Sequence, residues 1–248
     1  MRILMVAAEN GALPGGKVGG IGDVIRDVPT ALARAGHQVD VVTPGYQSLS
    51  LLPGTQLQNR LTLEFAGALE SIVLFKAAVP QSLAGVEHWL VENRIFAACG
   101  VGMIYCNDGA GPFATDARKF ALFCHAVCHA LVTGALPWPD VIHLHDWHGA
   151  PLLFLRKYLP AYRKLLDIFC VYSVHNLSLQ GVRPFSNNES ALESWFPIRA
   201  YNREEIADPV AGDCVNMMRM GINLADRIHV VSPTYAREIL LPSIPEQG

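Results

Sequence analysis

Apolar residues along this chain fall in short runs that alternate with helix-like patterns. Residues 3–8 form one apolar run and residues 39–43 form another. Between them, residues 22–35 have the spacing of an amphipathic helix that ends at Gly36. Because continuous apolar runs are typical of strands covered on both faces, this order predicts a β-α-β unit in a parallel sheet.

The same alternation returns in the second half of the chain. It predicts strands at residues 141–145, 168–175 and 228–232, and helices at residues 150–158 and 214–224. The whole pattern predicts an α/β fold, a Rossmann-like parallel sheet with helices on both faces.

Two parts of the chain depart from this rhythm. Residues 61–65, 72–79 and 86–92 are separated only by short turns, so we expect an inserted section of strands joined without helices. The last residues contain two prolines, which favour neither a helix nor a central strand. We therefore expect one domain over residues 1–240 and the start of a linker at 241–248.

Composition narrows the possible partners. Of 248 residues, 51% are hydrophobic, and 19 Lys and Arg against 22 Asp and Glu give a net charge of −3. Such a chain has no broad positive field for a polyanion, so we expect no nucleic-acid partner. No run approaches the roughly 20 apolar residues of a membrane span, so we expect no membrane association.

The six cysteines do not form the pattern of a small disulfide-rich scaffold. The apolar run at the N-terminus is too short for a signal peptide. Both observations favour a cytoplasmic location.

The first predicted strand leads into a glycine-rich loop that opens onto a helix. Its backbone N–H groups and Lys17 could hold a phosphate. Residues 11–17 have Walker A spacing, but Val18 offers no hydroxyl to a magnesium ion, and Ile25 replaces the third glycine of a dinucleotide fingerprint. Both motifs are incomplete, so loop composition alone leaves a strand–helix connection without a ligand equally open.

Histidines near the end of one predicted strand raise the question of a metal. His143 and His145 share a strand face, and His148 begins the next element. Metal sites usually add a carboxylate or thiolate from elsewhere, and the Asp-Trp pair between these histidines fits a polar sugar pocket, so we expect no metal. Cys124 and Cys128, with a histidine after each, miss the haem-attachment spacing and favour a packed helix.

Four stretches, in order, resemble bacterial glycogen synthases and plant starch synthases. Residues 17–24 are similar to the family's Lys-x-Gly-Gly-Leu-Gly-Asp-Val signature, and Glu9 matches a family glutamate. The further stretches are residues 143–148, 173–181 and 216–239, and residues 116–121 look like a family helix start. The resemblance runs from Met1 to about Ile239. It departs before Tyr105, where the family's Asp-Arg-Pro-Gly-type segment is missing.

The resemblance implies the N-terminal, acceptor-side half of a two-domain GT-B glycosyltransferase, with a C-terminal domain of comparable size as its partner. The implied reaction is transfer of glucose from ADP-glucose to an α-1,4-glucan or maltooligosaccharide, with retention and without metal or cofactor. The resemblance implies three sets of site residues. The catalytic residues are His175, Asp146 and Glu9. The donor diphosphate is bound by Lys17, Gly19, Gly20 and Asp23, and the sugars are bound by Tyr105, His145, Asn176 and Gln180.

Alternatives remain open at this point. Taken alone, His175 is as consistent with a hydrogen-bonded strand end as with a catalytic role, and Asp146 with a helix cap. The chain is also compatible with another sugar-nucleotide glycosyltransferase of the same architecture, or with a non-catalytic glucan-binding or regulatory module. The preference for ADP-glucose or UDP-glucose is not readable from these residues.

Overall fold

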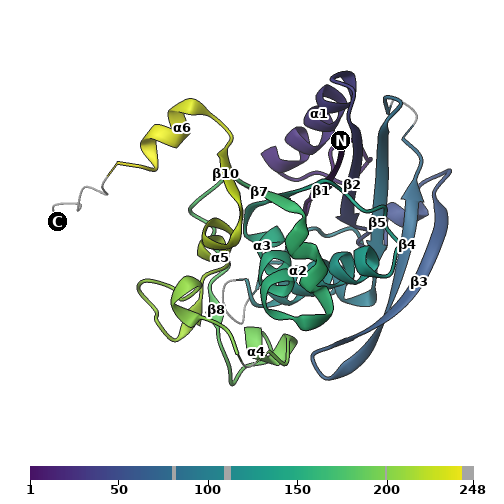
Figure 1. Ribbon diagram of the computed structural model, residues 1–248. Helices are drawn as coiled ribbons and strands as arrows, with labels where there is room; N and C mark the ends of the chain where they lie inside the picture. Colours follow the sequence, from purple (N-terminus) through teal and green to yellow (C-terminus); the bar gives the residue numbers. More distant parts are fainter. Residues whose placement is uncertain (80–81, 109–112, 199, 242–248) are drawn as a thin grey trace.

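A computed structural model describes residues 1–79, 82–108, 113–198 and 200–241, and it contains one mixed sheet of eight strands. The sheet order is β10-β7-β6-β1-β2-β5-β4-β3 (Figure 1). Its strands are β1 (Arg2–Val6), β2 (Gln38–Pro44), β3 (Gln56–Phe65), β4 (Ala68–Ala77), β5 (Val86–Glu92), β6 (Val141–His145), β7 (Phe169–Val174) and β10 (Arg227–Val230). A separate pair joins β8 (Arg183–Pro184) to β9 (Cys214–Val215).

Six helical segments are α-helices and four are short 3-10 helices within the described residues. The α-helices are α1 (Gly20–Arg34), α2 (Ala114–Val132), α3 (Asp146–Tyr158), α4 (Leu192–Trp195), α5 (Met217–Leu224) and α6 (Pro233–Glu238). The 3-10 helices are η1 (Leu49–Leu51), η2 (Arg94–Ala97), η3 (Pro160–Asp167) and η4 (Arg203–Glu205).

Strand direction explains where polar residues gather. β1 pairs in parallel with β2 on one side and β6 on the other, and β7 and β10 continue the parallel order. The carboxyl ends of parallel strands lie at one edge, so the segments that follow β1, β6 and β7 meet there. The predicted inserted strands exist, but β3, β4 and β5 extend the same sheet, with β4 antiparallel to both neighbours.

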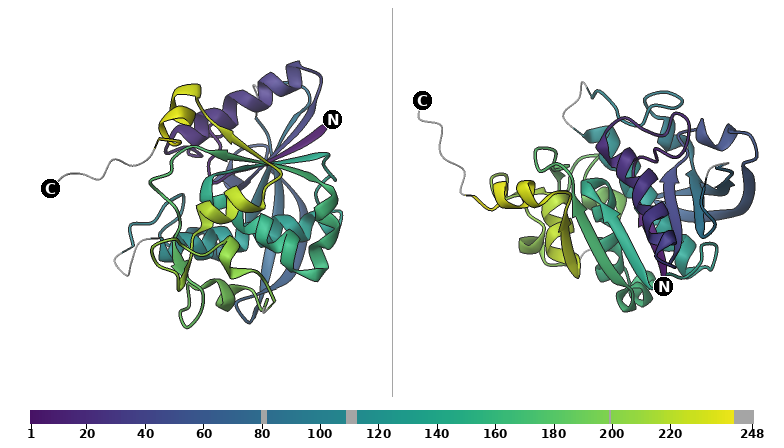
Figure 2. Two further views of the ribbon diagram at one scale, coloured as in Figure 1. Left: turned by 60° about the vertical axis from the view of Figure 1, so that its left-hand side comes forward. Right: turned by 90° about the horizontal axis from the view of Figure 1, so that it is seen from above.

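Helices cover the two faces of the sheet unequally. A small cluster packs Ile21 and Ile25 of α1 against one face, whereas the large cluster under α2, α3 and α5 fills the other. Figure 2 (left) shows the purple α1 on one side of the sheet and the teal and green helices on the other. The predicted fold class, a Rossmann-like α/β sheet with helices on both faces, is confirmed.

Several element boundaries differ from the prediction, two of them because a side chain caps a helix. The predicted helix over 214–224 divides into β9 and α5, because the Asn216 side chain accepts a hydrogen bond from the Arg219 N–H. β10 ends at Val230 because Ser232 caps α6 in the same way. α3 begins at Asp146, four residues before the predicted start. Residues 242–248 of the predicted linker lie outside the described residues.

The helix that carries the cysteine–histidine pairs is a packed helix, as predicted. Cys124 and Cys128 of α2 are fully buried, and His125 packs edge-on against Tyr162. Elsewhere Cys99 and Cys106 form a disulfide that the cysteine spacing did not predict. None of the helices in the described part of the chain has the length and apolar character that crossing a bilayer would require.

Candidate active site

A cleft of about 970 Å³ opens at the carboxyl edge of the parallel strands. It lies between the N-terminus of α1, the segment around Tyr105, and the ends of β6 and β7. Clefts of this size at this edge are typical of ligand sites in open α/β sheets. Among the described residues, the predicted site residues that line it are Glu9, Gly19, Gly20, Tyr105, Asp146, His175 and Asn176.

Glu9 makes hydrogen bonds to both sides of the cleft. One carboxylate oxygen accepts hydrogen bonds from the N–H groups of Val18 and Gly19, at 2.8 and 2.7 Å, and the other accepts from the Tyr105 hydroxyl at 2.8 Å. The carboxylate therefore lies at the positive N-terminal end of α1, where a negative charge is favourable. The Gly19 N–H, which we predicted for a diphosphate, donates to Glu9 in this structure.

Glycines let this loop approach the helix closely. The Gly11 N–H donates to the Gly22 carbonyl at 3.0 Å. A Cβ on Gly11 would lie 2.4 Å from that carbonyl oxygen, and one on Gly22 would lie 2.7 Å from Cγ of Lys17. Both positions therefore need glycine for close packing.

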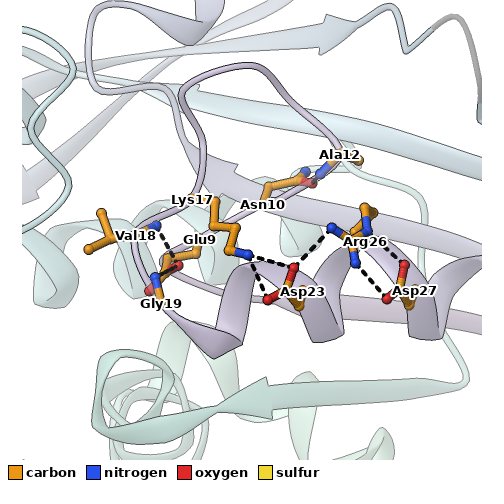
Figure 3. A network of polar contacts seen from close by, with 9 residues as sticks. All are labelled: Glu9, Asn10, Ala12, Lys17, Val18, Gly19, Asp23, Arg26 and Asp27. Atoms are coloured by element: carbon orange, nitrogen blue, oxygen red, sulfur yellow. Dashed lines mark hydrogen bonds and ion pairs between the residues drawn. The ribbon is translucent and has the colours of Figure 1, made fainter.

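Lys17 and Asp23 do not line the cleft in this structure. The Lys17 ammonium lies 2.6 Å from a carboxylate oxygen of Asp23, and Arg26 extends the ion pairs along the exposed side of α1 to Asp27 (Figure 3). The Lys17 side chain is 43% exposed. For the predicted phosphate contact Lys17 would first have to leave Asp23, and solvent exposure keeps the cost of that exchange small.

Asp146 stands at the turn from β6 to α3 with φ of 52°, an uncommon value for a residue with a side chain. Its carboxylate accepts from the His175 N–H at 2.7 Å and the Asn176 N–H at 3.4 Å. Asp146 thus joins two strand ends, and α3 begins at Asp146 itself with His145 as its N-cap. Burial raises the pKa of Asp146 to about 6, against the lowering effect of those two hydrogen bonds.

His175 lines the cleft and is held from behind by His145. Nε2 of His175 lies 2.9 Å from Nδ1 of His145. Burial lowers the pKa of His175 to about 4, and burial also lowers the pKa of His145, so both rings are neutral near pH 7. His145 is fully buried and does not line the cleft, so its predicted sugar contact becomes a positioning contact to His175.

The buried surroundings of His145 favour one tautomer. Its Nε2 atom is buried and has no hydrogen-bond partner among the described residues. A buried N–H without a partner is less favourable than a buried lone pair without one, so the proton belongs on Nδ1 of His145. His145 then donates to Nε2 of His175, which leaves Nδ1 of His175 protonated as a donor.

The three histidines that we considered as metal ligands, His143, His145 and His148, do not point to one common position. His143 Nε2 lies 2.7 Å from the Ser173 hydroxyl, His145 contacts His175, and the His148 ring packs against Phe120 with centroids 4.6 Å apart. In the described ranges no group of three or more His, Cys, Asp or Glu residues is arranged to hold a metal ion.

An aromatic wall completes the cleft, and it includes Trp147 of the Asp-Trp pair for which the sequence suggested a sugar pocket. Trp147 and His148 line the cleft beside Tyr105, and the Tyr105 and His148 rings lie 5.4 Å apart. The Trp147 Nε1 atom is buried and has no hydrogen-bond partner among the described residues. The position of Trp147 directly after a strand-end aspartate was the available signal.

Gln180 lies outside the lining of the cleft. Its side-chain oxygen accepts from Asn216 Nδ2, and its amide donates to the Leu177 carbonyl at 2.9 Å. Gln180 therefore stabilises the segment that follows β7, and the described contacts give it no direct place at the predicted sugar site.

The fold and the cleft define a class of protein. The parallel sheet, the loop at the N-terminus of α1 and the polar strand ends match one half of a GT-B glycosyltransferase. The catalytic domain of starch synthase IV from Arabidopsis thaliana superimposes with a TM-score of 0.76 at 25% identity, over 96% of this chain and 46% of that chain.

Sequence comparison identifies the family. A family model described as the starch synthase catalytic domain matches residues 2–248. Glycogen synthases from Streptococcus gordonii and Streptococcus pneumoniae are each 36% identical over 247 residues, which is 98% and 97% of this chain. The chain belongs to the starch synthase catalytic domain family. It spans about half, 47%, of the length of those two relatives.

Proposed function

We propose that this chain is the acceptor-side half of a retaining glucosyltransferase that extends α-1,4-glucan from ADP-glucose. The observation that carries the proposal is the cleft in which Glu9, Asp146 and His175 converge from the ends of β1, β6 and β7. The starch synthase IV structure similar to this chain was solved with ADP and acarbose bound, which supports a nucleotide and a glucan as ligands.

The chemistry of the cleft fits a transition state with oxocarbenium character. Positive charge on the glucosyl ring is favoured by the carboxylate of Asp146, which is largely ionised at neutral pH. A neutral His175 with a protonated Nδ1 can donate to a sugar hydroxyl without adding positive charge. Negative charge on the departing diphosphate requires donors, for which Lys17, once released from Asp23, and the Gly20 N–H are the proposed groups.

The proposal places the second half of the donor site on a C-terminal domain that this chain does not include. A donor held by one half alone would stay in contact with water, where each charged contact contributes little. We therefore expect this chain to bind maltooligosaccharide weakly and to transfer no glucose. We propose that the transfer needs no metal and takes place in the cytoplasm.

The test compares the chain alone with the chain joined to the C-terminal half that its relatives carry. Both are supplied with maltooligosaccharide and either ADP-glucose or UDP-glucose, and chain elongation is measured. Elongation by the joined protein with ADP-glucose, and none by the chain alone, is expected. Appreciable elongation by the chain alone would contradict the half-site argument, and a preference for UDP-glucose would contradict the proposed donor.

A further inference from the structure

A second cavity of about 950 Å³ lies away from the cleft, and no residue lines both. Its walls come from η2, the first turns of α2, and the segment from β8 to residue 190. Phe113 and Asp116 face the cleft, whereas Thr115 and Arg118 line the second cavity. The start of α2 thus separates two sites.

Three arginines from three different elements line this cavity. They are Arg94 of η2, Arg118 of α2 and Arg183 of β8. Arginine carries five N–H donors in a planar fork that matches phosphate oxygens. Three such groups around one cavity supply more donors than a neutral sugar would need.

Arg118 has donor capacity that the protein does not use. Its Nε atom is buried and has no hydrogen-bond partner among the described residues. Such a buried donor is costly unless a ligand or water accepts from it. Arg118 therefore has a free donor for an acceptor beyond the described residues, such as a bound ligand.

The other two arginines make hydrogen bonds within the protein, Arg94 from a largely exposed side chain and Arg183 from a buried one. Arg94 donates to Glu70 at 3.1 Å, and Arg183, which is 8% exposed, donates to the Ser190 carbonyl at 3.3 Å. Against burial, bonds from Asn93 and Arg94 and the charge of Arg118 hold the pKa of Glu70 below its usual value. Arg94 and Arg118 thus act on the same carboxylate.

Two acidic residues near the cavity already have partners, and one of them, Glu70, is paired with Arg94. Glu70 is engaged by Arg94 and Asn93. Both carboxylate oxygens of Asp108 are engaged by Thr115. Of the residues that line the cavity, Glu189 is the acidic one, and it is exposed.

We propose that this cavity binds a phosphate group, either as inorganic phosphate or as a phosphate monoester on a sugar. Arg118 and the Arg94 donors that Glu70 does not occupy bind the phosphate oxygens, and the buried Arg183 adds positive charge to the cavity wall. The site goes beyond the proposed glucosyl transfer, because neither the donor diphosphate nor a neutral glucan is needed to fill it.

The test is a calorimetric titration of the 248-residue chain with inorganic phosphate, with glucose 6-phosphate and with maltose, at constant ionic strength in acetate. We expect saturable binding of phosphate, and about tenfold weaker binding in Arg118→Gln and in Arg94→Gln. Arg163→Gln, which removes an exposed arginine of η3, is the matched control and should leave the affinity unchanged. Circular dichroism verifies that each variant is folded.

The remaining outcomes of the titration either identify the ligand or contradict the proposal. Tighter binding of glucose 6-phosphate than of inorganic phosphate would identify a sugar ester as the ligand, and the reverse would identify the free ion. No saturable binding of either, or binding that maltose displaces, would overturn the proposal. Phosphate affinity that falls in Lys17→Ala but not in Arg118→Gln would also overturn it, because the ion would then lie in the cleft. No sugar nucleotide is present, so failure of glucosyl transfer cannot cause any of these results.

Discussion

The two sides of the cleft hold their polar groups in opposite ways. On the loop side, Lys17, Asp23 and Arg26 form ion pairs in contact with solvent. On the strand side, His175 lines the cleft with His143 and His145 packed behind it, and burial strongly lowers the pKa values of all three. Exposed ion pairs exchange partners at a small cost in free energy, whereas a buried group changes its partner or its charge only at a large cost. The loop side is therefore suited to binding and releasing a donor. The strand side is suited to keeping its side chains in a fixed geometry.

The largest expected effect lies on the strand side. In the chain joined to its C-terminal half, His175→Ala should lower kcat by about 100-fold or more, because one fixed donor at the glucosyl unit is lost. The melting temperature should change little, since His175 stands at a strand end. Normal turnover with a large loss of melting temperature would instead make His175 a purely structural residue.

A pH-dependent change in stability should distinguish the buried side. Burial lowers the pKa of His143 to about 4, from 6.5 when unfolded, so between these values the unfolded chain binds more protons. As pH falls from 6.5 toward 4, the wild type should lose on the order of 3 kcal/mol of unfolding free energy relative to His143→Gln. Urea unfolding across this range measures the difference.

The loop side provides the control for this experiment. Lys17→Gln should follow the pH dependence of the wild type over the same range, because the substituted group remains in contact with solvent. If His143→Gln also followed the wild type, the ring would already be solvated or protonated in the folded state, and the comparison of the two sides would fail.

The loop side should respond in donor affinity. In the joined protein, Lys17→Ala should weaken binding of the sugar nucleotide by on the order of 1.5–3 kcal/mol, the usual contribution of a charge-assisted hydrogen bond. Affinity for maltooligosaccharide should not change. An unchanged dissociation constant for the nucleotide would remove Lys17 from the donor site.

The pH dependence of turnover should report the strand-end carboxylate. Because the pKa of Asp146 is raised to about 6, its ionised form is lost as pH falls through that value. Below it, kcat should fall by about tenfold per pH unit. In Asp146→Asn this acid limb should disappear and kcat should be low at every pH. If kcat of Asp146→Asn still fell below about pH 6, the pH dependence would belong to another titrating group.

The smallest expected effect tests the partner exchange of Lys17. Asp23→Asn removes the carboxylate that competes with phosphate for Lys17, so the sugar nucleotide should bind up to about fivefold more tightly, the range of an exposed ion pair. Weaker nucleotide binding would mean that Asp23 itself takes part in donor recognition.

Local pattern determined much of this protein. β5 (Val86–Glu92) and β6 (Val141–His145) lie where the apolar runs placed them, because strand periodicity depends on backbone geometry and near neighbours. The same periodicity placed His143 and His145 on one face, and their ring centroids lie 4.3 Å apart. The glycine-rich loop and the strand-end aspartate were visible as ordered motifs in the sequence.

Only the tertiary structure determined which groups each site side chain contacts. The Glu9 carboxylate accepts from the N–H groups of Val18 and Gly19. Lys17 is paired with Asp23, and His145 contacts His175. The arginine cavity joins three elements that stand far apart in the sequence. Such contacts depend on how the sheet and helices pack at long range, and burial, which sets the pKa values, exists only after packing. The sequence therefore determined the elements and the edge of the sheet that carries the cleft, and packing determined what each side chain binds there.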